Sequence, residues 1–450
     1  MSQASQAEEA PRKRRFQMPP AFRYPAYRAY WLGTLASVGG FQMLTFGQGW
    51  LTFEETGSEV RLGFVLAANG FASIALNLFG GVLADRLDKR RLIITTQLVT
   101  AALIFLLATL VFTGVIAYWH IVVIALFSGA TNAFDQPARQ ALYPHLIDRK
   151  VMVSAVALNS AVWQGTRIVA PGVAGFMIGQ LGTASSLYMA GSGFVVMAMV
   201  IFWLHIPKIE TVVRGSAAQN LLGGLKFIAG DRVFSFLIGM TFFNSFFGMA
   251  YVAMMPVFTV DVLGVGAEKQ GLLMSVGGIG ALGVTMLLGA RSNFAQKELL
   301  IIGGAVVFGV SVAAFALTAQ YVGNFYLAMA LIVIMGISSS AYMISIMSSL
   351  QILVPNDKRG RVMGFYGMTW SIMPLGALWA GVLGDAIDSV PWAIAIGGLL
   401  VSGFAVGPAL VNKRLRSIGT LLQEAEQGPV DDRRAPDRQT ESAPTAGAND

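Results

Sequence analysis

Cysteine is absent from the 450 residues, and charged residues make up only 12% of them. The missing cysteines exclude disulfide bonds and thiolate metal sites. The three histidines, His120, His145 and His205, are widely separated in sequence and do not suggest a metal site. A soluble chain carries about twice this share of charge. With 55% hydrophobic residues and a mean hydropathy of +0.63, the composition indicates an integral membrane protein.

Motifs of several enzyme classes are missing as well. The chain has no phosphate-binding loop ending in Gly-Lys-Ser/Thr, no Ser-His-Asp set and no His-Glu-x-x-His zinc motif. These absences argue against an ATP-driven pump or a membrane hydrolase, so we expect no enzyme activity, no metal and no bound cofactor. The net charge of +7 could suggest nucleic acid, but its placement along the chain indicates membrane topology instead. We therefore expect no nucleic-acid partner.

Long apolar segments dominate the sequence. A bilayer core of about 30 Å needs roughly 20 apolar residues per helix, and backbone groups inside it must be hydrogen-bonded. The segments that qualify lie near residues 29–53, 61–84, 92–113, 118–138, 155–180, 184–205, 233–260, 268–289, 299–318, 323–350, 361–385 and 391–411. We predict an all-α membrane protein with twelve transmembrane helices in two six-helix bundles.

Lysine and arginine concentrate on one side of the predicted helices. Of the 31 basic residues, 28 fall in the two tails and in the loops that follow every second helix. The opposite loops hold Arg61 and Lys269, and Arg167 lies inside a helix. The positive-inside rule then places both termini in the cytoplasm.

A long polar gap divides the twelve segments into two groups of six. We predict a cytosolic tail over 1–27, a helical bundle over 28–206, a cytosolic linker over 207–232, a second bundle over 233–412 and a disordered tail over 413–450. Within the linker, Leu221, Leu225 and Ile228 share one helical face, which predicts a short amphipathic helix at the membrane surface.

One cytosolic turn carries the most specific motif. The stretch GVLADRLDKRRL, Gly81–Leu92, resembles the major facilitator signature G-x-L-A-D-R-x-G-R-R, except that Asp88 replaces the second glycine. Further stretches resemble the exporter branch that holds siderophore exporters, drug:proton antiporters and transmembrane secretion effectors; they are Phe22–Gly33, Phe134–Ile147, Ala157–Gly175 and Arg359–Met368. The resemblance implies the major facilitator fold, a small-molecule substrate and a place in the bacterial inner membrane, where a monomer is expected.

The signature turn predicts a gate. Gly81 permits close approach of a neighbouring helix, as small residues do in membranes. Asp85 places a negative charge at the membrane edge, where the N-terminal end of another helix offers partial positive charge. The resemblance implies that this partner is helix 11, which begins here near Arg361. Arg139 is a second candidate partner for Asp85.

The gating prediction includes basic residues of the same turn. The full set is Gly81, Asp85, Arg86, Arg90, Arg139 and Arg361. An alternative remains open for the basic run, since Lys89, Arg90 and Arg91 also suit a topology anchor against anionic lipid.

Polar side chains mark a candidate cavity. The resemblance implies that helices 1, 4, 7 and 10 line a central cavity, and these segments carry Gln42 and Asn244 near mid-span and Asn132 within the span. We predict that all three contact substrate, together with Trp370 on helix 11. The Ser and Thr residues nearby equally suit helix packing.

Arg167 is the one formal charge deep within a predicted helix. An ionisable residue at that depth is costly and is by default a functional hypothesis. Trp163 and Gln164 lie within one turn of it, so we predict that the three residues bind an amphipathic substrate. The alternative is a structural arginine that ties helices together through backbone carbonyls.

Proton antiport is the expected mechanism, with the proton gradient as the energy source, but no carrier is assigned. The acids nearest the membrane, Asp135 among them, lie toward helix ends, and Ala125 stands where related antiporters have the arginine of R-x-x-x-G on helix 4. We expect export of drug-like or siderophore-like molecules by alternating access. A lipid flippase or scramblase of the same fold, or a membrane sensor that does not transport, is the alternative.

Overall fold

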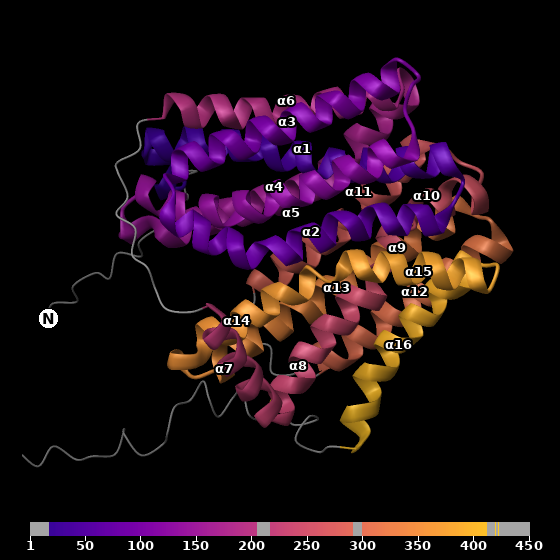
Figure 1. Ribbon diagram of the computed structural model, residues 1–450. Helices are drawn as coiled ribbons and strands as arrows, with labels where there is room; N and C mark the ends of the chain where they lie inside the picture. The colour runs from indigo at the N-terminus through magenta and orange to yellow at the C-terminus, as the bar shows by residue number, and fades with distance from the viewer. Residues whose placement is uncertain (1–17, 205–216, 291–298, 412–418, 420–421, 423–450) are drawn as a thin grey trace, which may run out of the picture. The chain divides into compact units, whose positions relative to one another are not determined.

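The computed structural model describes residues 18–204, 217–290 and 299–411, together with Gly419 and Leu422; within these ranges the side chains of 77–86, 217–222, 289–290, 356–357 and 411 are not described. Helices form nearly all of this part, which contains no β-strand. The all-α prediction is therefore confirmed (Figure 1).

The chain divides into two compact units. Unit 1 comprises Met1–Gly47, Ala72–Ile116 and Phe127–Val213, and unit 2 comprises Gln48–Phe71, Ala117–Leu126 and Arg214–Asp450. This division does not fall at the linker. Three segments of the first half belong to unit 1, and two segments of the first half belong to unit 2 together with the second half of the chain. The predicted bundle boundaries stay a prediction.

The helices of the first half are continuous. They are η1 (Pro20–Arg23), α1 (Pro25–Thr56), α2 (Glu59–Arg86), α3 (Lys89–Phe112), α4 (Tyr118–Leu142), η2 (Tyr143–Leu146), η3 (Arg149–Val151), α5 (Met152–Leu181) and α6 (Thr183–Trp203). Within unit 1, α3 packs along α6 (Figure 1).

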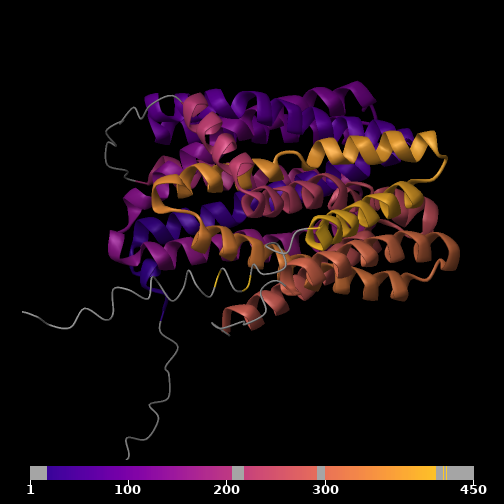
Figure 2. The same cartoon turned by 90° about the horizontal axis from the view of Figure 1, so that it is seen from below.

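The second half contains interrupted helices. Its elements are α7 (Ala217–Gly230), α8 (Arg232–Phe243), η4 (Asn244–Gly248), α9 (Ala250–Ala253), α10 (Met255–Val257), η5 (Phe258–Val262), α11 (Ala267–Ala290), η6 (Leu299–Gly303), α12 (Gly304–Val322), α13 (Phe325–Leu353), α14 (Asn356–Trp370), α15 (Met373–Ala386) and α16 (Val390–Val411). The elements η4, η5 and η6 are π-helical turns. Within unit 2, α12 packs along the yellow α16 (Figure 2), and α11 packs along α13.

Length and apolarity qualify eight stretches of the described chain as membrane-crossing helices. They are Glu59–Leu76, Lys89–Phe112, Thr183–Trp203, Arg232–Val262, Ala267–Leu288, Leu299–Val322, Phe325–Leu353 and Val390–Leu410. The other predicted segments coincide with α1, α4, α5 and the pair α14–α15, which do not meet the same criteria of length and apolarity. The count of twelve spans therefore stays a prediction.

Glycines permit the closest helix crossings in unit 2. A methyl group on Gly309 of α12 would meet the carbonyl oxygen of Gly398 on α16, and a methyl group on Gly398 would meet that of Gly309. At the crossing of α11 with α13, Gly336 faces the carbonyl oxygen of Gly277 in the same way. Membrane helices gain contact by such backbone approach because lipid supplies no hydrophobic driving force between them.

The linker forms a helix, α7, but its buried face differs from the predicted one. Ile228 is buried as expected, whereas Leu225 is 50% exposed; the side chain of Leu221 lies outside the described part. Gly224 is buried against Phe365 of α14, since a glycine lets that ring approach the helix backbone. The helix therefore packs on protein through Gly224 and Ile228, and the prediction for Leu225 is wrong.

Candidate functional site

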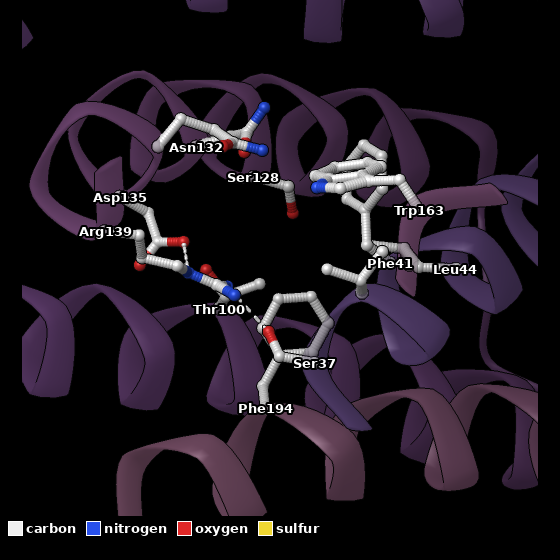
Figure 3. A pocket seen from close by; sticks show the side chains of 12 residues that line it. Ser37, Phe41, Leu44, Thr100, Ser128, Asn132, Asp135, Arg139, Trp163 and Phe194 are labelled. Carbon is white, nitrogen blue, oxygen red and sulfur yellow. Dashed lines mark hydrogen bonds and ion pairs between the residues drawn. The ribbon is translucent and has the colours of Figure 1, made fainter. Parts of the chain in front are cut away.

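Unit 1 contains a polar hollow bounded by five helices (Figure 3). The space free of protein atoms in it is about 430 Å³, a volume that includes open solvent. The lining residues are Ser37, Val38, Phe41 and Leu44 of α1, Thr100 of α3, Ser128, Asn132, Asp135, Gln136 and Arg139 of α4, Trp163 of α5 and Phe194 of α6. We call this space the unit 1 hollow.

A buried ion pair lies at one end of the unit 1 hollow. Asp135 and Arg139 are four residues apart on α4, so their side chains lie on one face of the helix. Arg139 Nε donates to Asp135 Oδ2 at 2.6 Å, and the two side chains are only 11% and 8% exposed. A pair this deeply buried persists only where further hydrogen bonds satisfy both partners.

Those hydrogen bonds come from two neighbouring helices. Arg139 Nη2 donates to Ser37 Oγ of α1 at 2.7 Å, and Ser37 Oγ donates to Gln97 Oε1 of α3 at 2.9 Å. The ring closes where Gln97 Nε2 donates to Asp135 Oδ1 at 2.9 Å. We call Ser37, Gln97, Asp135 and Arg139 the ion-pair ring. It joins α1, α3 and α4 through charge-assisted bonds, which are stronger than neutral ones.

Thr96 adds a further bond to this ring from outside. Its hydroxyl donates to Asp135 Oδ1 at 2.9 Å and also lies 3.0 Å from the carbonyl oxygens of Leu92 and Ile93. With Thr96 and Gln97 on Oδ1 and Arg139 on Oδ2, both carboxylate oxygens have donors.

The opposite wall of the hollow is aromatic with a few polar groups. The rings of Phe41 and Trp163 meet edge to face, with centroids 6.3 Å apart. Ser128 is buried, and its hydroxyl has no hydrogen-bond partner in the described part of the chain. Figure 3 shows the Ser128 hydroxyl directed into the space below the amide of Asn132. An apolar wall with a few convergent polar groups is typical of a small-molecule site.

Three of the predicted site residues therefore meet here. Trp163 and Asn132, predicted to bind substrate, line the hollow together with Arg139. Arg139 was predicted to pair with Asp85, but its ion pair in the described structure is formed with Asp135 on the same helix. The side chain of Asp85 lies outside the described part, so that half of the prediction is not tested.

Arg167 and Gln164 lie elsewhere on α5. Both are exposed, and Ser160 is exposed on the same face, at spacings of four and three residues. No hydrogen bond or ion pair is found for the Arg167 side chain within the described ranges. A polar face of this kind on a membrane helix must meet water or a polar ligand, because lipid would leave it unsatisfied.

The other residues predicted to bind substrate do not line the unit 1 hollow. Gln42 is half-buried on α1 and is not among the lining residues. Asn244, in the π-helical turn η4 of unit 2, is fully buried, and its Oδ1 accepts from the Tyr342 hydroxyl. Trp370 is half-buried at the end of α14. Their roles in substrate binding stay predictions.

The predicted gate residues are partly described. Gly81, Asp85 and Arg86 fall on α2, with side chains outside the described part. Arg90 donates to the carbonyls of Ile201 and Phe202 at the end of α6, where a cation satisfies unpaired carbonyls.

Arg361 and Asp88 have structural partners. The Arg361 side chain lies over Gly223 and Gly224 of α7, although the residue is exposed overall. Asp88, the departure from the signature, is the N-cap of α3, and its Oδ1 accepts from the backbone N–H of Arg91 at 3.0 Å. A side-chain acceptor at the N-cap satisfies one of the unpaired backbone N–H groups at the start of the helix.

Sequence reasoning missed most of the ion-pair ring. Ser37, Thr96 and Gln97 gave no signal of their own, since isolated hydroxyls and amides are common in membrane helices. Asp135 was placed toward a helix end, yet it lies well inside α4 and is 6% exposed. The D-x-x-x-R spacing of Asp135 and Arg139 was the available signal.

Comparison with known proteins agrees with this architecture. A family described as transmembrane secretion effector matches residues 18–435. The chain is 23% identical over 388 residues to macrolide efflux protein A of Streptococcus pyogenes, covering 84% of this chain and 94% of that protein. It is 25% identical over 392 residues to the staphyloferrin A transporter of Staphylococcus aureus, covering 85% and 94%. It is 23% identical over 400 residues to the enterobactin exporter EntS of Shigella boydii, covering 87% and 93%.

Solved structures show the same fold. The nucleoside transporter NupG superposes with a TM-score of 0.65 at 15% identity, covering 87% of this chain and 99% of that one. An inward-facing bacterial homolog of the human lysosomal transporter Spinster superposes with a TM-score of 0.65 at 14% identity, covering 91% and 98%. At these identities the likeness concerns the fold alone.

Proposed function

The chain belongs to the transmembrane secretion effector family of the major facilitator superfamily, and from this premise we propose that it is a secondary-active exporter. Its substrates are small amphipathic molecules, drug-like or siderophore-like, and its energy source is the proton gradient. Relatives with names for macrolide efflux, staphyloferrin A transport and enterobactin export support this substrate range. The two predicted six-helix bundles rearrange by alternating access, as transporters with repeated bundles do.

The unit 1 hollow is the observation that carries this proposal. It combines an aromatic wall of Phe41 and Trp163 with a buried ion pair and the free hydroxyl of Ser128. The apolar wall suits the hydrophobic part of an amphipathic ligand, and the polar groups can orient the rest of it. Burying an ion pair in a membrane helix is costly, which favours a role in transport over one in packing.

The proposed topology has twelve spans and two cytoplasmic termini. It rests on the placement of 28 of the 31 basic residues and on helices at all twelve predicted segments. The exposed polar face of α5 at Arg167 is proposed as a further substrate contact. In this topology, reporter fusions in the loop at Arg61 report the outside and fusions at the C-terminus report the cytoplasm.

Transport by purified protein in proteoliposomes tests the function. The probes are a macrolide, staphyloferrin A, enterobactin and a fluorescent phospholipid, each measured with and without an imposed pH gradient. We expect the gradient to drive accumulation of at least one of the first three and to leave the phospholipid in place. Phospholipid movement alone would favour the flippase alternative, and movement of none would favour the sensor. Drug and metabolite profiles of a deletion strain extend the probe set.

A further inference from the structure

Asp135 is unusual among the charged residues of the described chain. Only two charged side chains there are buried, Asp135 and Lys89, so Asp135 is the only buried acid within the described ranges. It lies on α4 and borders the unit 1 hollow, part of which is open to solvent. A proton from water can therefore reach a carboxylate that is otherwise enclosed by protein.

The ion-pair ring is arranged around the charged form of this carboxylate. Within the described residues, every hydrogen-bond partner of Asp135 is a donor: Arg139 Nε on Oδ2, and Gln97 Nε2 and Thr96 Oγ1 on Oδ1. If the Gln97 amide turned around to accept from Asp135, it would lose the hydrogen bond that its Oε1 accepts from Ser37. A protonated Asp135 would have to donate a hydrogen bond, so protonation must change the ring.

Thr96 can make that change with little movement. Its hydroxyl is 3.0 Å from the Leu92 carbonyl, so it can rotate to donate there and accept from a protonated Asp135. Arg139 then loses its ion pair and keeps its bond to Ser37. The Thr96 hydroxyl can thus bond to Asp135 in both of its protonation states. Protonation of Asp135 ends the ion pair of Arg139.

The other described side chains around Asp135, apart from Arg139, carry no charge. From α3 it meets Thr96 and Gln97, and the rest of the hollow presents Phe194 of α6, Trp163 of α5 and uncharged residues of α1. The nearest titratable group from α1 is the hydroxyl of Tyr30, which donates to the backbone carbonyl of Arg139 at 3.4 Å. Among the described residues, Arg139 is the one charge that faces the carboxylate.

We infer that Asp135 is the residue that carries the coupling proton, with Arg139 as its internal counter-ion and Thr96 as the hydroxyl that accommodates both states. The inference rests on the proposed proton-coupled export. A proton passes from water to Asp135 Oδ1, which then donates to Thr96 Oγ1; Arg139 stays protonated and loses the negative charge it paired with at Oδ2, and the net charge of the ion-pair ring rises from zero to +1. The reverse step returns the proton to water.

The sign of this change selects a substrate class. A ring of charge +1 repels a cation in the same hollow, so proton and cationic ligand exclude each other, and mutual exclusion is what antiport requires. An anion would instead bind best with the proton and travel with it. The geometry therefore favours amphipathic cations, with Phe41 and Trp163 as the apolar and cation–π surface.

Chemical labelling tests the titration without any substrate. The full chain in proteoliposomes is treated with the apolar reagent N,N′-dicyclohexylcarbodiimide, which reacts with protonated carboxyls, between about pH 5 and pH 9, and peptides are mapped by mass spectrometry. We expect an adduct on Asp135 whose yield falls by up to about tenfold per pH unit above its midpoint. In Arg139→Gln the adduct should extend to higher pH, because the counter-ion is gone. No adduct on Asp135 at any pH, in either protein, would overturn the inference.

Transport of ethidium, a permanent cation, tests the coupling. Asp135→Asn holds the ion-pair ring at +1, as protonation does, so it should lose uptake driven by a pH gradient and weaken ethidium exchange; adding Arg139→Gln makes the ring neutral and should restore the exchange without the gradient dependence. Thr96→Ser should keep both, and Thr96→Val should lose gradient-driven uptake. Thr285→Val is the matched control, because its hydroxyl donates within α11 to Ala281. Gradient-driven uptake by Asp135→Asn would refute the inference.

The two proposals fail in different ways. If wild-type protein moves no probe under a pH gradient, proton-coupled export is refuted, while the labelling still decides whether Asp135 titrates. If wild-type protein is gradient-driven and Asp135→Asn is too, export stands and the proton is carried elsewhere.

Discussion

Replacing Gly309 by alanine should destabilise unit 2 by about 1–3 kcal/mol, the usual cost of overpacking a close contact. The new methyl group would collide with the carbonyl oxygen of Gly398 and lie 3.0 Å from the backbone nitrogen of Ser402. Both are backbone atoms, so no side-chain rotation can relieve the contact. The axes of α12 and α16 must separate, and the packing along the rest of their length loosens with them.

Gly403→Ala is the matched control. It lies on α16 as well, but nothing lies within 4 Å of the position that its methyl group would take. Alanine there should be neutral or stabilising by up to about 1 kcal/mol, since glycine disfavours a helix. The two substitutions add the same atoms and should have opposite effects.

Thermal denaturation of the purified variants in detergent measures both effects. We expect Gly309→Ala to denature at a lower temperature than the wild-type protein, and Gly403→Ala at the same or a higher one. The double variant of Gly309 and Gly398 should cost less than the sum of the two single changes, because the first methyl group already separates the helices. Equal denaturation temperatures for Gly309→Ala and Gly403→Ala would refute the close crossing.

Two further predictions concern single side chains. If Arg167 binds substrate through its exposed position on α5, Arg167→Lys should weaken apparent affinity and Arg167→Gln should weaken it more, with denaturation temperatures unchanged; loss of stability in both would assign it a structural role. Tyr342→Phe removes the donor to Asn244 Oδ1, whose amide nitrogen has no partner within the described structure. It should cost about 1–3 kcal/mol of unfolding free energy, and a smaller loss for Tyr342→Phe than for a surface Tyr321→Phe would contradict this account.

The sequence predicted the helices well because the bilayer leaves little choice. An apolar stretch of sufficient length must pair its backbone groups internally, and a helix does so within one segment. The predicted segments near 92–113 and 184–205 therefore agree with α3 and α6 to within a few residues. Hydropathy gave no sign of the π-helical turns η4 and η5, which insert extra residues per turn and change which face a residue occupies.

The ion-pair ring was much harder to predict. Ser37 and Gln97 are 60 residues apart in sequence, and Arg139 is 102 residues from Ser37. Nothing local indicates that α1, α3 and α4 bring these side chains together, since that depends on helix packing. The resemblance implied helix 11 as the partner of Asp85, and Arg139 was only a second candidate; Asp135 lies four residues from Arg139 on α4 and needs no tertiary contact to reach it.

The N-cap at Asp88 bears on which residue types can stand at this position of the signature turn. The family signature has a glycine at this position. Here the Asp88 carboxylate accepts a hydrogen bond from the backbone N–H of Arg91. Asparagine and serine make the same bond, and glycine costs only a few tenths of a kcal/mol relative to them at such a site. This position should therefore accept any residue type that can begin a helix. A signature pattern that allows only glycine there would miss transporters whose turn begins the helix as this one does.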